Sequence, residues 1–423
     1  MPLWLIPIVY AVASTICSLV LPRIESGYFP DHIAAMSVAS AQAFLSAAAS
    51  GMMALTGIVF AVAFVMVQFS AVAYSPRLVL WFARDPTLFH SLGIFVATFV
   101  YSLATIAWVD RDGSGTVPLF SLILVSILLL VSVLLFSCLV QRLAQLQIAN
   151  VLHLLGDKGR EVIRETFHER SGQSWHDQAE RAEFASGHGF APVTQTLKYS
   201  GNPRSITKFD VDRLVRLAQR ADAVIVIACS VGDTLVENTS LLRVHGGKCE
   251  LSARALIRGV HLARERTFEQ DPKYAIRLLV DIAIRALSPA INDPTTAVQT
   301  IDQIEDLLLR LGGRGLDAGH VRDRSGALRL VYPMPTWEDY LTLAFDEIRQ
   351  YGAGSVQVMR RLRSALGCLE DAMTIPSRAE AVRRNIRHLD LVIQTSTLDA
   401  EDRLIALQED RQGLGLSRKR AIA

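Results

Sequence analysis

The polar residues whose types and spacing could do chemistry are few, and the densest group runs from Arg285 to Pro294. This run, RALSPAINDP, carries a guanidinium, a hydroxyl, an amide and a carboxylate. Gathered in a cleft, such groups could bind a ligand or support acid–base chemistry. Asn-Asp-Pro is also a favourable helix start, with Asp as N-cap and Pro in the first turn. We expect a capped corner between two helices, with a ligand site as the alternative. The candidate positions are Arg285, Ser288, Pro289, Asn292, Asp293 and Pro294.

The signatures of familiar enzymes are missing from the sequence. Gly246-Gly247-Lys248 lacks the upstream glycine and the following Ser or Thr of a phosphate-binding loop. Nucleophile elbow, HExxH, CxxC and dinucleotide-binding glycine motifs are also absent. The five cysteines are scattered, and His168, His176 and His188 lack the spacing of metal ligands. We therefore predict a protein that is not an enzyme and that holds no cofactor and no metal.

Apolar runs dominate the first third of the chain. Of its 423 residues, 51% are hydrophobic and 20% charged, and the mean hydropathy is +0.30. About 20 apolar helical residues cross the roughly 30 Å of hydrocarbon in a bilayer. We predict four spans, over about 2–21, 44–69, 88–108 and 117–140. The first is expected to be a retained span, because no basic region precedes it as in a signal peptide.

The segment 46–77, which contains most of the second span, is expected to organise the chain. Small residues recur there at helical spacing. They let helix backbones approach closely, which matters in lipid because helices there have no hydrophobic reason to associate. Helix packing is one interpretation, and a helix that lines a water path is the other. The candidate pore or packing positions are Ala47, Gly51, Ala54, Thr56, Gly57, Ala61 and Gln68.

Charged residues are expected only outside the spans. Arg23 and Glu25 are assigned to the loop after the first span, and the lack of buried charge disfavours a proton-coupled pump. Hydroxyl groups inside the spans are expected to bond to their own backbone or to a neighbouring helix. Lys and Arg are more frequent in the second connection and after the fourth span, so both termini should be cytoplasmic.

Four regions follow from these patterns. We predict a transmembrane domain over 1–145, a helical extension and linker over 146–192 that is weakened at Gly156 and Gly159, a small α+β domain over 193–250 and a helical cytoplasmic domain over 251–423. The fold class is a mainly α membrane protein, with a four-helix transmembrane region and a cytoplasmic α+β domain.

The small domain should begin with strand, helix and strand. The expected segments are Thr194–Tyr199, Asp210–Ala221 with Asp210 as N-cap, and Ala223–Cys229. The next stretch, Gly232 to Val244, resembles the closing hairpin of biotinyl- and lipoyl-type barrels, although it has no modifiable lysine at its tip. Asn238 stands at the turn position where that pattern has Gly. A barrel or hammerhead is therefore expected, with an ordinary hairpin as the alternative.

Helices should fill the remainder, apart from a short strand near 327–334. The expected helices are Ala253–Phe268, Lys273–Leu287, about 294–311, Trp337–Tyr351, Ser355–Met373, Arg378–Thr395 and Ala400 to about Gln412. The expected helices Ser355–Met373 and Arg378–Thr395 contain several arginines, with Asp and Glu between them. A solvated face is the expected interpretation, and a stripe that faces phosphate or lipid is the alternative.

Two blocks of sequence carry a family resemblance. GIVFAVAFVMVQFSAVAYSPRLVLWFARDPTLFHSLGIFVATFVYSLAT and QDPKYAIRLLVDIAIRALSPAINDPTTA look like a bacterial family of predicted membrane proteins with a domain of unknown function. The resemblance implies several N-terminal spans and a large soluble C-terminal part, and it lends no activity. Its distinctive pieces are the run Ser75, Pro76 and Arg77, the pair Arg84 and Asp85, the pair Gly232 and Asp233, and the run from Arg285 to Pro294.

These observations favour a function in the inner membrane. A net charge of +2 gives no general attraction to nucleic acid. We predict an oligomeric channel or passive transporter with a cytoplasmic gating or assembly domain. The alternatives are a membrane-anchored scaffold or sensor and, less favoured, a membrane-bound enzyme. The expected partners are the lipid bilayer, further copies of the chain, and a small ion or solute.

Overall fold

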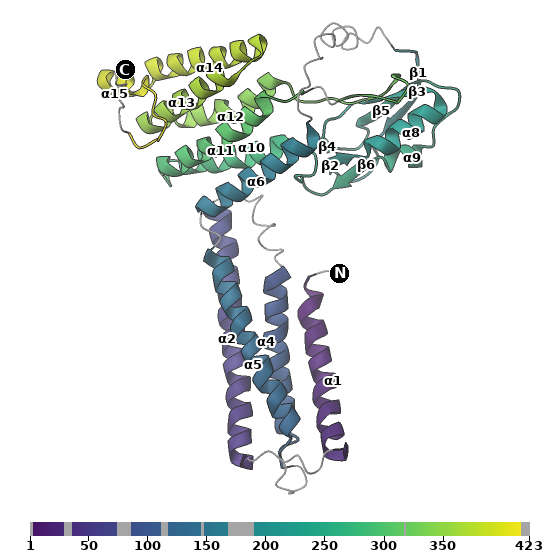
Figure 1. Cartoon of the computed structure of the whole chain (residues 1–423), viewed down its shortest axis with the longest axis vertical. Helices are drawn as coiled ribbons and strands as arrows, with labels where there is room; N and C mark the ends of the chain where they lie inside the picture. Colours follow the sequence, from purple (N-terminus) through teal and green to yellow (C-terminus); the bar gives the residue numbers. More distant parts are fainter. Residues whose placement is uncertain are drawn as a thin grey trace. The chain divides into compact units, whose positions relative to one another are not determined.

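The structure is a computed structural model, and it describes residues 3–28, 36–73, 86–110, 117–144, 148–167, 190–316 and 319–415. The chain forms two compact units. Met1–Asn150 is called the membrane unit, and Val151–Ala423 is called the C-terminal unit. Figure 1 labels most elements of both.

Among its described residues, the membrane unit has four helices that are each long and apolar enough to cross a membrane, as the sequence predicts. One assignment in this unit is wrong. The first helix does not end near residue 21 but continues past Pro22 to Tyr28, so Arg23 and Glu25 are helical residues and not part of a loop. The helices are α1 (Leu5–Tyr28), α2 (Val38–Ala73), α4 (Pro86–Ile106) and α5 (Leu119–Ala144).

The helix at the centre of this unit is α4, whereas the sequence analysis predicts that the segment containing α2 organises the chain. The α4 helix packs against α1, α2 and α5, and it is the most buried of the four. Small side chains allow the close approach. At Gly93 an added Cβ would lie only 2.5 Å from the ring of Tyr10 on α1. The buried α4 residues are Ser91, Leu92, Gly93, Phe95, Ala97, Thr98, Tyr101, Ser102 and Thr105.

Two sheets form part of the C-terminal unit. The five-stranded sheet has the order β1-β5-β3-β8-β7, with β3 and β8 parallel and the other neighbours antiparallel. The three-stranded sheet has the order β4-β2-β6 and is antiparallel. The strands are β1 (Val193–Lys198), β2 (Arg204–Phe209), β3 (Ala223–Ile227), β4 (Thr234–Leu235), β5 (Ser240–Gly246), β6 (Val260–Ala263), β7 (His320–Arg322) and β8 (Leu328–Val331).

The predicted hairpin or barrel over Gly232 to Val244 is wrong. Its turn forms as expected, with Asn238 at a φ of 65°, but β4 and β5 pair in different sheets. The reason is a pair of backbone hydrogen bonds with Ile206 of β2. The Gly232 N–H donates to the Ile206 carbonyl (2.8 Å), and the Ile206 N–H donates to the Asp233 carbonyl (2.9 Å). They attach β4 to β2, and the described strands form no closed barrel.

A second correction concerns the predicted helix Ala253–Phe268. The structure has only the short helix α9 (Ala253–Ile257), followed by β6. β6 supplies the second neighbour of β2, so the sheet requires strand where local propensity favoured helix. The helix α8 (Val211–Ala221) forms as predicted, and the Asp210 side chain accepts a hydrogen bond from the Arg213 backbone N–H.

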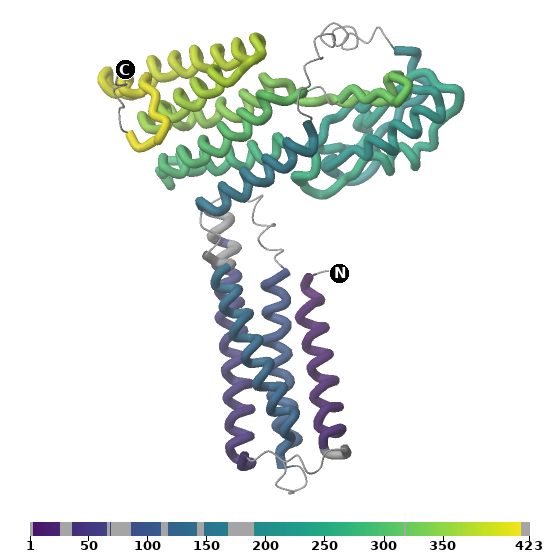
Figure 2. The backbone as a smooth tube through the Cα atoms, viewed as in Figure 1, coloured from purple at the N-terminus to yellow at the C-terminus, as the bar shows by residue number. Residues whose placement is uncertain are grey.

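A helical layer completes the C-terminal unit, and Figure 2 follows its course. The buried centre of this layer is α10. The break predicted in α6 at Gly156 and Gly159 is absent: the helix is continuous, and an added Cβ at Gly159 would lie 2.8 Å from Leu307 of α11. The helices are α6 (Ile148–Thr166), α10 (Pro272–Ala286), α11 (Pro294–Gly312), α12 (Trp337–Tyr351), α13 (Val356–Ala372), α14 (Pro376–Thr395) and α15 (Ala400–Ala406).

Candidate functional site

Buried polar side chains line the interior of the membrane unit along α4. The Ser14 hydroxyl of α1 donates to the Ala97 carbonyl (2.6 Å). The Tyr101 hydroxyl donates to Ser121 of α5 at 3.3 Å. Three buried atoms, Ser91 Oγ, Ser102 Oγ and Glu25 Oε2, have no hydrogen-bond partner in the described chain. Sites of this kind commonly hold buried water.

Several hydroxyls in the four helices follow the backbone pattern that the sequence analysis expects. Each donates to a carbonyl four residues earlier in its own helix, so it adds little polarity to the surface of the helix. The pairs are Thr56 with Met52, Thr98 with Ile94, Thr105 with Tyr101, Ser126 with Leu122, Ser132 with Leu128 and Ser137 with Val133.

Glu25 is a buried carboxylate that the sequence reasoning missed. Its residue is only 5% exposed, and Oε1 accepts a hydrogen bond from the Phe120 backbone N–H at the start of α5 (2.8 Å). The positive end of the α5 dipole favours a carboxylate at this position, and so does a backbone N–H that the helix itself cannot pair. The sequence did carry a signal, because the helical pattern continues on both sides of Pro22. A proline normally interrupts a helix, and this obscured the signal.

The small residues of α2 are exposed in the single chain. Nothing lies within 4 Å of an added Cβ at Gly51 or Gly57. The opposite face of α2, with Leu45, Met52 and Val59, packs inside the membrane unit. The exposed candidate positions are Ala47, Gly51, Ala54, Gly57, Ala61 and Gln68, and Thr56 is half-buried.

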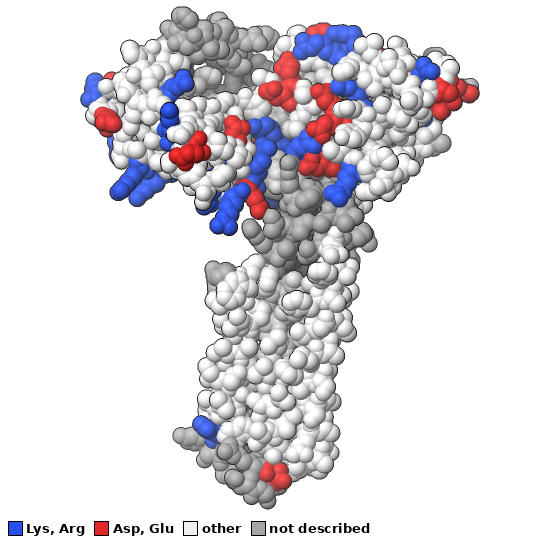
Figure 3. Space-filling view, turned by 180° about the vertical axis from the view of Figure 1, so that it is seen from behind, with Lys and Arg blue, Asp and Glu red and all other residues white. Residues whose placement is uncertain are grey.

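Charged side chains on one face of the membrane unit gather at one of its ends, as Figure 3 shows, and the rest of that face is uncharged. This is the surface composition that a span in lipid requires. The four candidate residues of the connection after α2, namely Pro76, Arg77, Arg84 and Asp85, lie outside the described residues.

Gly232 and Asp233 lie beside the start of α10. The φ of Gly232 is +90°, and an added Cβ would lie 2.2 Å from Arg266 Nη2 and 2.4 Å from Asp271 Oδ2. Arg266 and Asp271 form an ion pair of 2.7 Å directly over this glycine. The Lys273 ammonium donates to the Val231 carbonyl (3.1 Å). The glycine therefore makes room for contacts between the 230–233 loop and α10.

Asp271 is a second buried acid that the sequence reasoning passed over. Burial raises the pKa of its carboxyl, although Arg266 and Lys273 act in the opposite direction. Asp271 Oδ1 and the hydroxyl of Tyr340 are both buried and without hydrogen-bond partners among the described atoms. Burial also raises the pKa of Tyr340, and the Asp271 charge adds to that shift.

The run from Arg285 to Pro294 forms the corner between α10 and α11. Asp293 accepts hydrogen bonds from the backbone and the hydroxyl of Thr296 (3.1 and 2.5 Å). The Ser288 hydroxyl donates to the Arg285 carbonyl, and Asn292 has a φ of 48°. Pro289 and Asn292 are exposed, and Pro294 is the first residue of α11. No contact joins the Arg285 and Asn292 side chains in the described chain, so the capping interpretation accounts for the geometry.

The two motifs of the C-terminal unit do not form one site. Gly232 lies at the N-terminal end of α10, and the Arg285 run lies at its C-terminal end. A helix of this length spans about 22 Å. Among the residues that the structure describes, no group of three or more His, Cys, Asp or Glu side chains could hold a metal ion.

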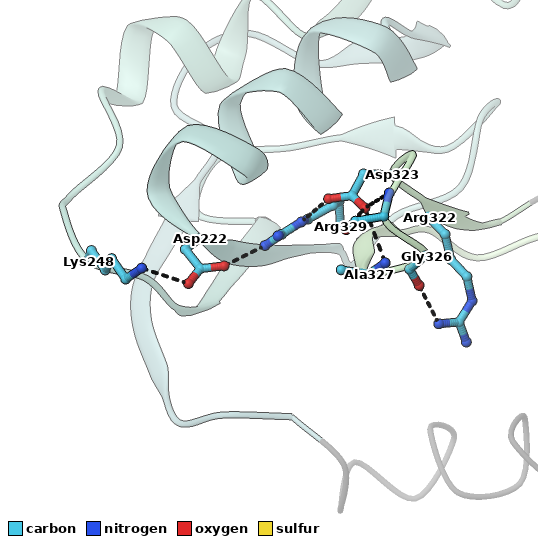
Figure 4. A network of polar contacts seen from close by, with 8 residues as sticks. Asp222, Lys248, Arg322, Asp323, Gly326, Ala327 and Arg329 are labelled. Atoms are coloured by element: carbon cyan, nitrogen blue, oxygen red, sulfur yellow. Dashed lines mark hydrogen bonds and ion pairs between the residues drawn. The ribbon is translucent and has the colours of Figure 1, made fainter.

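A polar network holds the edge of the five-stranded sheet together (Figure 4). The Arg329 guanidinium of β8 bridges Asp222, at the end of α8, and Asp323, at 3.0 and 2.7 Å. The Ser325 hydroxyl and Arg329 lower the pKa of Asp323 below its usual range. Lys248 extends the network to Asp222 at the protein surface. These contacts have a structural role, because each one closes a turn or joins two elements.

Two mycobacterial proteins are similar to this chain over most of its length. Uncharacterized protein Mb1321c of Mycobacterium bovis and uncharacterized protein Rv1290c of Mycobacterium tuberculosis are each 29% identical to it over 381 residues. The match covers 87% of this chain and 71% of each relative. No solved structure matches the chain.

The family comparison agrees with the four apolar helices. The family described as "Predicted membrane protein (DUF2254)" matches residues 1–367, which include the whole membrane unit and all of the C-terminal unit up to the middle of α13. The chain therefore belongs to the DUF2254 family of predicted membrane proteins.

Proposed function

We propose that the chain is a non-enzymatic subunit of an oligomeric channel or passive transporter of the inner membrane, with the C-terminal unit as its gating or assembly part. The observation that carries the proposal is the exposed face of small residues on α2. Outward positions on α5 carry bulk, such as Leu130, Val133 and Leu134, as lipid-facing positions do. The α2 face carries Ala and Gly at several positions instead, although the large exposed side chains Met53, Ile58, Phe60, Phe64 and Val65 interrupt or flank it.

A path for an ion or a solute is then expected between copies of the chain. Large side chains, among them Phe95 and Tyr101, fill the interior of the single membrane unit. A second copy on the α2 face would bring two backbones close together, because glycine and alanine leave room for it.

Gly57→Leu tests this proposal. The expected result is loss of the oligomer, measured by native mass spectrometry, together with loss of ion flux in liposomes. In the described chain nothing lies within 4 Å of an added Cβ at this position, so the melting temperature of the single subunit should not change. The matched control is Ser126→Leu, which adds bulk at an exposed position on α5. An intact oligomer without flux would assign the face to a pore, and unchanged assembly and flux would assign it to lipid.

A membrane-anchored scaffold or sensor is the second candidate. It is favoured by hydroxyls such as those of Thr56, Thr98 and Ser132, which donate within their own helix and therefore offer little polarity to a path. Purified protein in liposomes separates the two candidates, because a scaffold leaves the vesicles tight to ions.

We also propose that both termini lie in the cytoplasm, since Lys and Arg are concentrated in the second connection and after the fourth span. Cysteine labelling at Gly113 and Gly187 tests this orientation. A membrane-impermeant reagent added outside the cell should label Gly113→Cys and leave Gly187→Cys unlabelled, and the reverse pattern would contradict it.

A further inference from the structure

Five arginines on one part of the C-terminal unit have no ionic partner. Their guanidinium groups make no hydrogen bond, ion pair or ring contact in the described chain. Four are exposed and Arg213 is half-buried. They are Arg213, Arg216 and Arg220 on α8, Arg254 on α9 and Arg258 directly after it.

The three arginines of α8 form a single stripe. They are spaced by three and four residues, which places them on one side of a helix. Leu214, Ala218 and Ala221 occupy the opposite side and are buried in the core of the β-rich part. The stripe therefore faces away from that core.

The arginines near α9 adjoin this stripe. Asp210, the N-cap of α8, donates its backbone N–H to the Gly259 carbonyl (2.9 Å). Gly259 also lies against Leu214, where an added Cβ would come within 2.5 Å. Arg258 precedes this glycine, so it lies next to the first turn of α8. Between Arg254 and Arg258 the apolar side chain of Ile257 is 45% exposed.

Arginines of the helical layer differ, because many of them have acidic partners. Arg361, for example, pairs with Asp302 and Glu305 and is almost fully buried. Other pairs are Arg277 with Glu347, Arg349 with Asp346, Arg363 with Asp390, Arg383 with Glu370 and Glu380, Arg384 with Glu338, and Arg387 with Glu380.

We propose that the five arginines and Ile257, the α8–α9 basic face, bind anionic lipid headgroups of the membrane that holds the protein. Unpaired guanidiniums complement headgroup phosphates and can donate two hydrogen bonds to each. An exposed apolar residue among them suits the boundary between headgroups and acyl chains. Only three residues of sequence separate α5 from α6, so the C-terminal unit is covalently tethered to a membrane helix. The proposal does not depend on channel activity.

A fluorescent probe at Ile257 tests the proposal in the full-length protein. The exposed native cysteines Cys17, Cys138 and Cys249 are first changed to Ser, and Ile257→Cys is labelled with an environment-sensitive dye. The protein is placed in nanodiscs of phosphatidylcholine alone or mixed with phosphatidylglycerol. We expect a blue shift, and quenching by headgroup spin-labelled lipid, only with phosphatidylglycerol. Both should disappear in about 1 M salt, where screening shortens the range of the attraction to about 3 Å.

Variants of the arginines provide the controls. Each Arg→Gln change in the basic face should weaken the lipid-dependent signal by about fivefold, whereas Arg→Lys should weaken it less, because lysine keeps the charge and loses only the paired hydrogen bonds. The matched control replaces Arg383, Arg384 and Arg387 of α14 with Gln and should leave the signal unchanged. Hydrogen exchange of the β3 amides shows whether each variant is folded.

Two outcomes would overturn the proposal. One is a probe signal that is the same in neutral and anionic nanodiscs. The other is a shift that occurs only when a soluble polyanion, such as a single-stranded oligonucleotide, is added, because the face would then bind nucleic acid and not lipid.

Discussion

Glu25 of α1 accepts, through Oε1, a hydrogen bond of 2.8 Å from the backbone N–H of Phe120 at the start of α5. The bond joins two residues that lie in different helices and are 95 positions apart in sequence. It also satisfies one of the N–H groups that a helix cannot pair within itself, at the positive end of the helix dipole. Glu25 thus acts as an N-terminal cap supplied by another helix.

Removing this cap should destabilise the membrane unit. We expect Glu25→Ala to lower the free energy of unfolding by about 1–2 kcal/mol, in line with other lost caps. Glu25→Gln keeps an acceptor oxygen of the same reach and should cost less. Thermal unfolding in detergent and hydrogen exchange at the Phe120 amide measure both variants, and equal stability of Glu25→Ala and wild type would contradict the capping role.

Gly232→Ala should destabilise the C-terminal unit through two effects. A non-glycine residue at positive φ costs about 1 kcal/mol, and the new methyl would collide with the Arg266–Asp271 pair. The control is Gly326→Ala, which has a similar φ of +85° and nothing within 4 Å of the added Cβ. Chemical unfolding should show a larger loss at Gly232, by about 1–3 kcal/mol. Equal losses of stability in the two variants would mean that the Arg266–Asp271 pair moves aside without an energetic cost.

Gly159→Ala tests the packing of α6 on the helical layer. Alanine favours a helix by about 1 kcal/mol over glycine, so an exposed position would gain stability. Here the new Cβ would lie 2.8 Å from Leu307 and 3.1 Å from Ala275, and we expect a net loss of about 1–2 kcal/mol. Hydrogen exchange of the α6 amides should accelerate. Gly354→Ala, with open space around it, is the control, and a gain in stability at Gly159 would contradict this packing.

Asp323→Asn should destabilise the protein in a manner that depends on pH. Hydrogen bonds from the Ser325 hydroxyl and Arg329 hold the pKa of Asp323 below its usual range, so folding favours the carboxylate. That stabilisation is fully present above the ordinary pKa of about 4 and is lost as the pH falls through the lowered value. The difference in urea midpoint between wild type and variant should therefore be larger at neutral pH than in acid. Asp371→Asn, an exposed position on α13, should show no such dependence.

Local sequence predicted the elements whose signals are local. Four long apolar runs gave four helices, because only a helix satisfies its own backbone in lipid. Asp210, Asp293 and Ser355 each begin a helix as N-caps. Trp337–Tyr351 was predicted to the residue.

The strands were harder to predict, because a strand depends on partners distant in sequence. Thr194–Tyr199 and Ala223–Cys229 were recognised from their alternation or burial, whereas β2, β6 and β7 were missed. β6 is a strand because β2 pairs with it across more than 50 residues of chain. A four-residue segment with two arginines nearby carries no periodic signal that would show this.

The features of the candidate site also fall into two groups, those that local sequence predicts and those that depend on distant partners. The sequence by itself determined which residues are small, charged or apolar, and hence the four spans, the capped corner at Asp293 and the small-residue face of α2. Only the tertiary structure decided that this face is exposed, that Glu25 is buried at the start of α5, and that the unpaired arginines lie on α8 and α9 and not on α13 and α14. The physical reason is that burial and ion pairing depend on which elements meet, and the residues that meet here are separated by tens of positions along the chain.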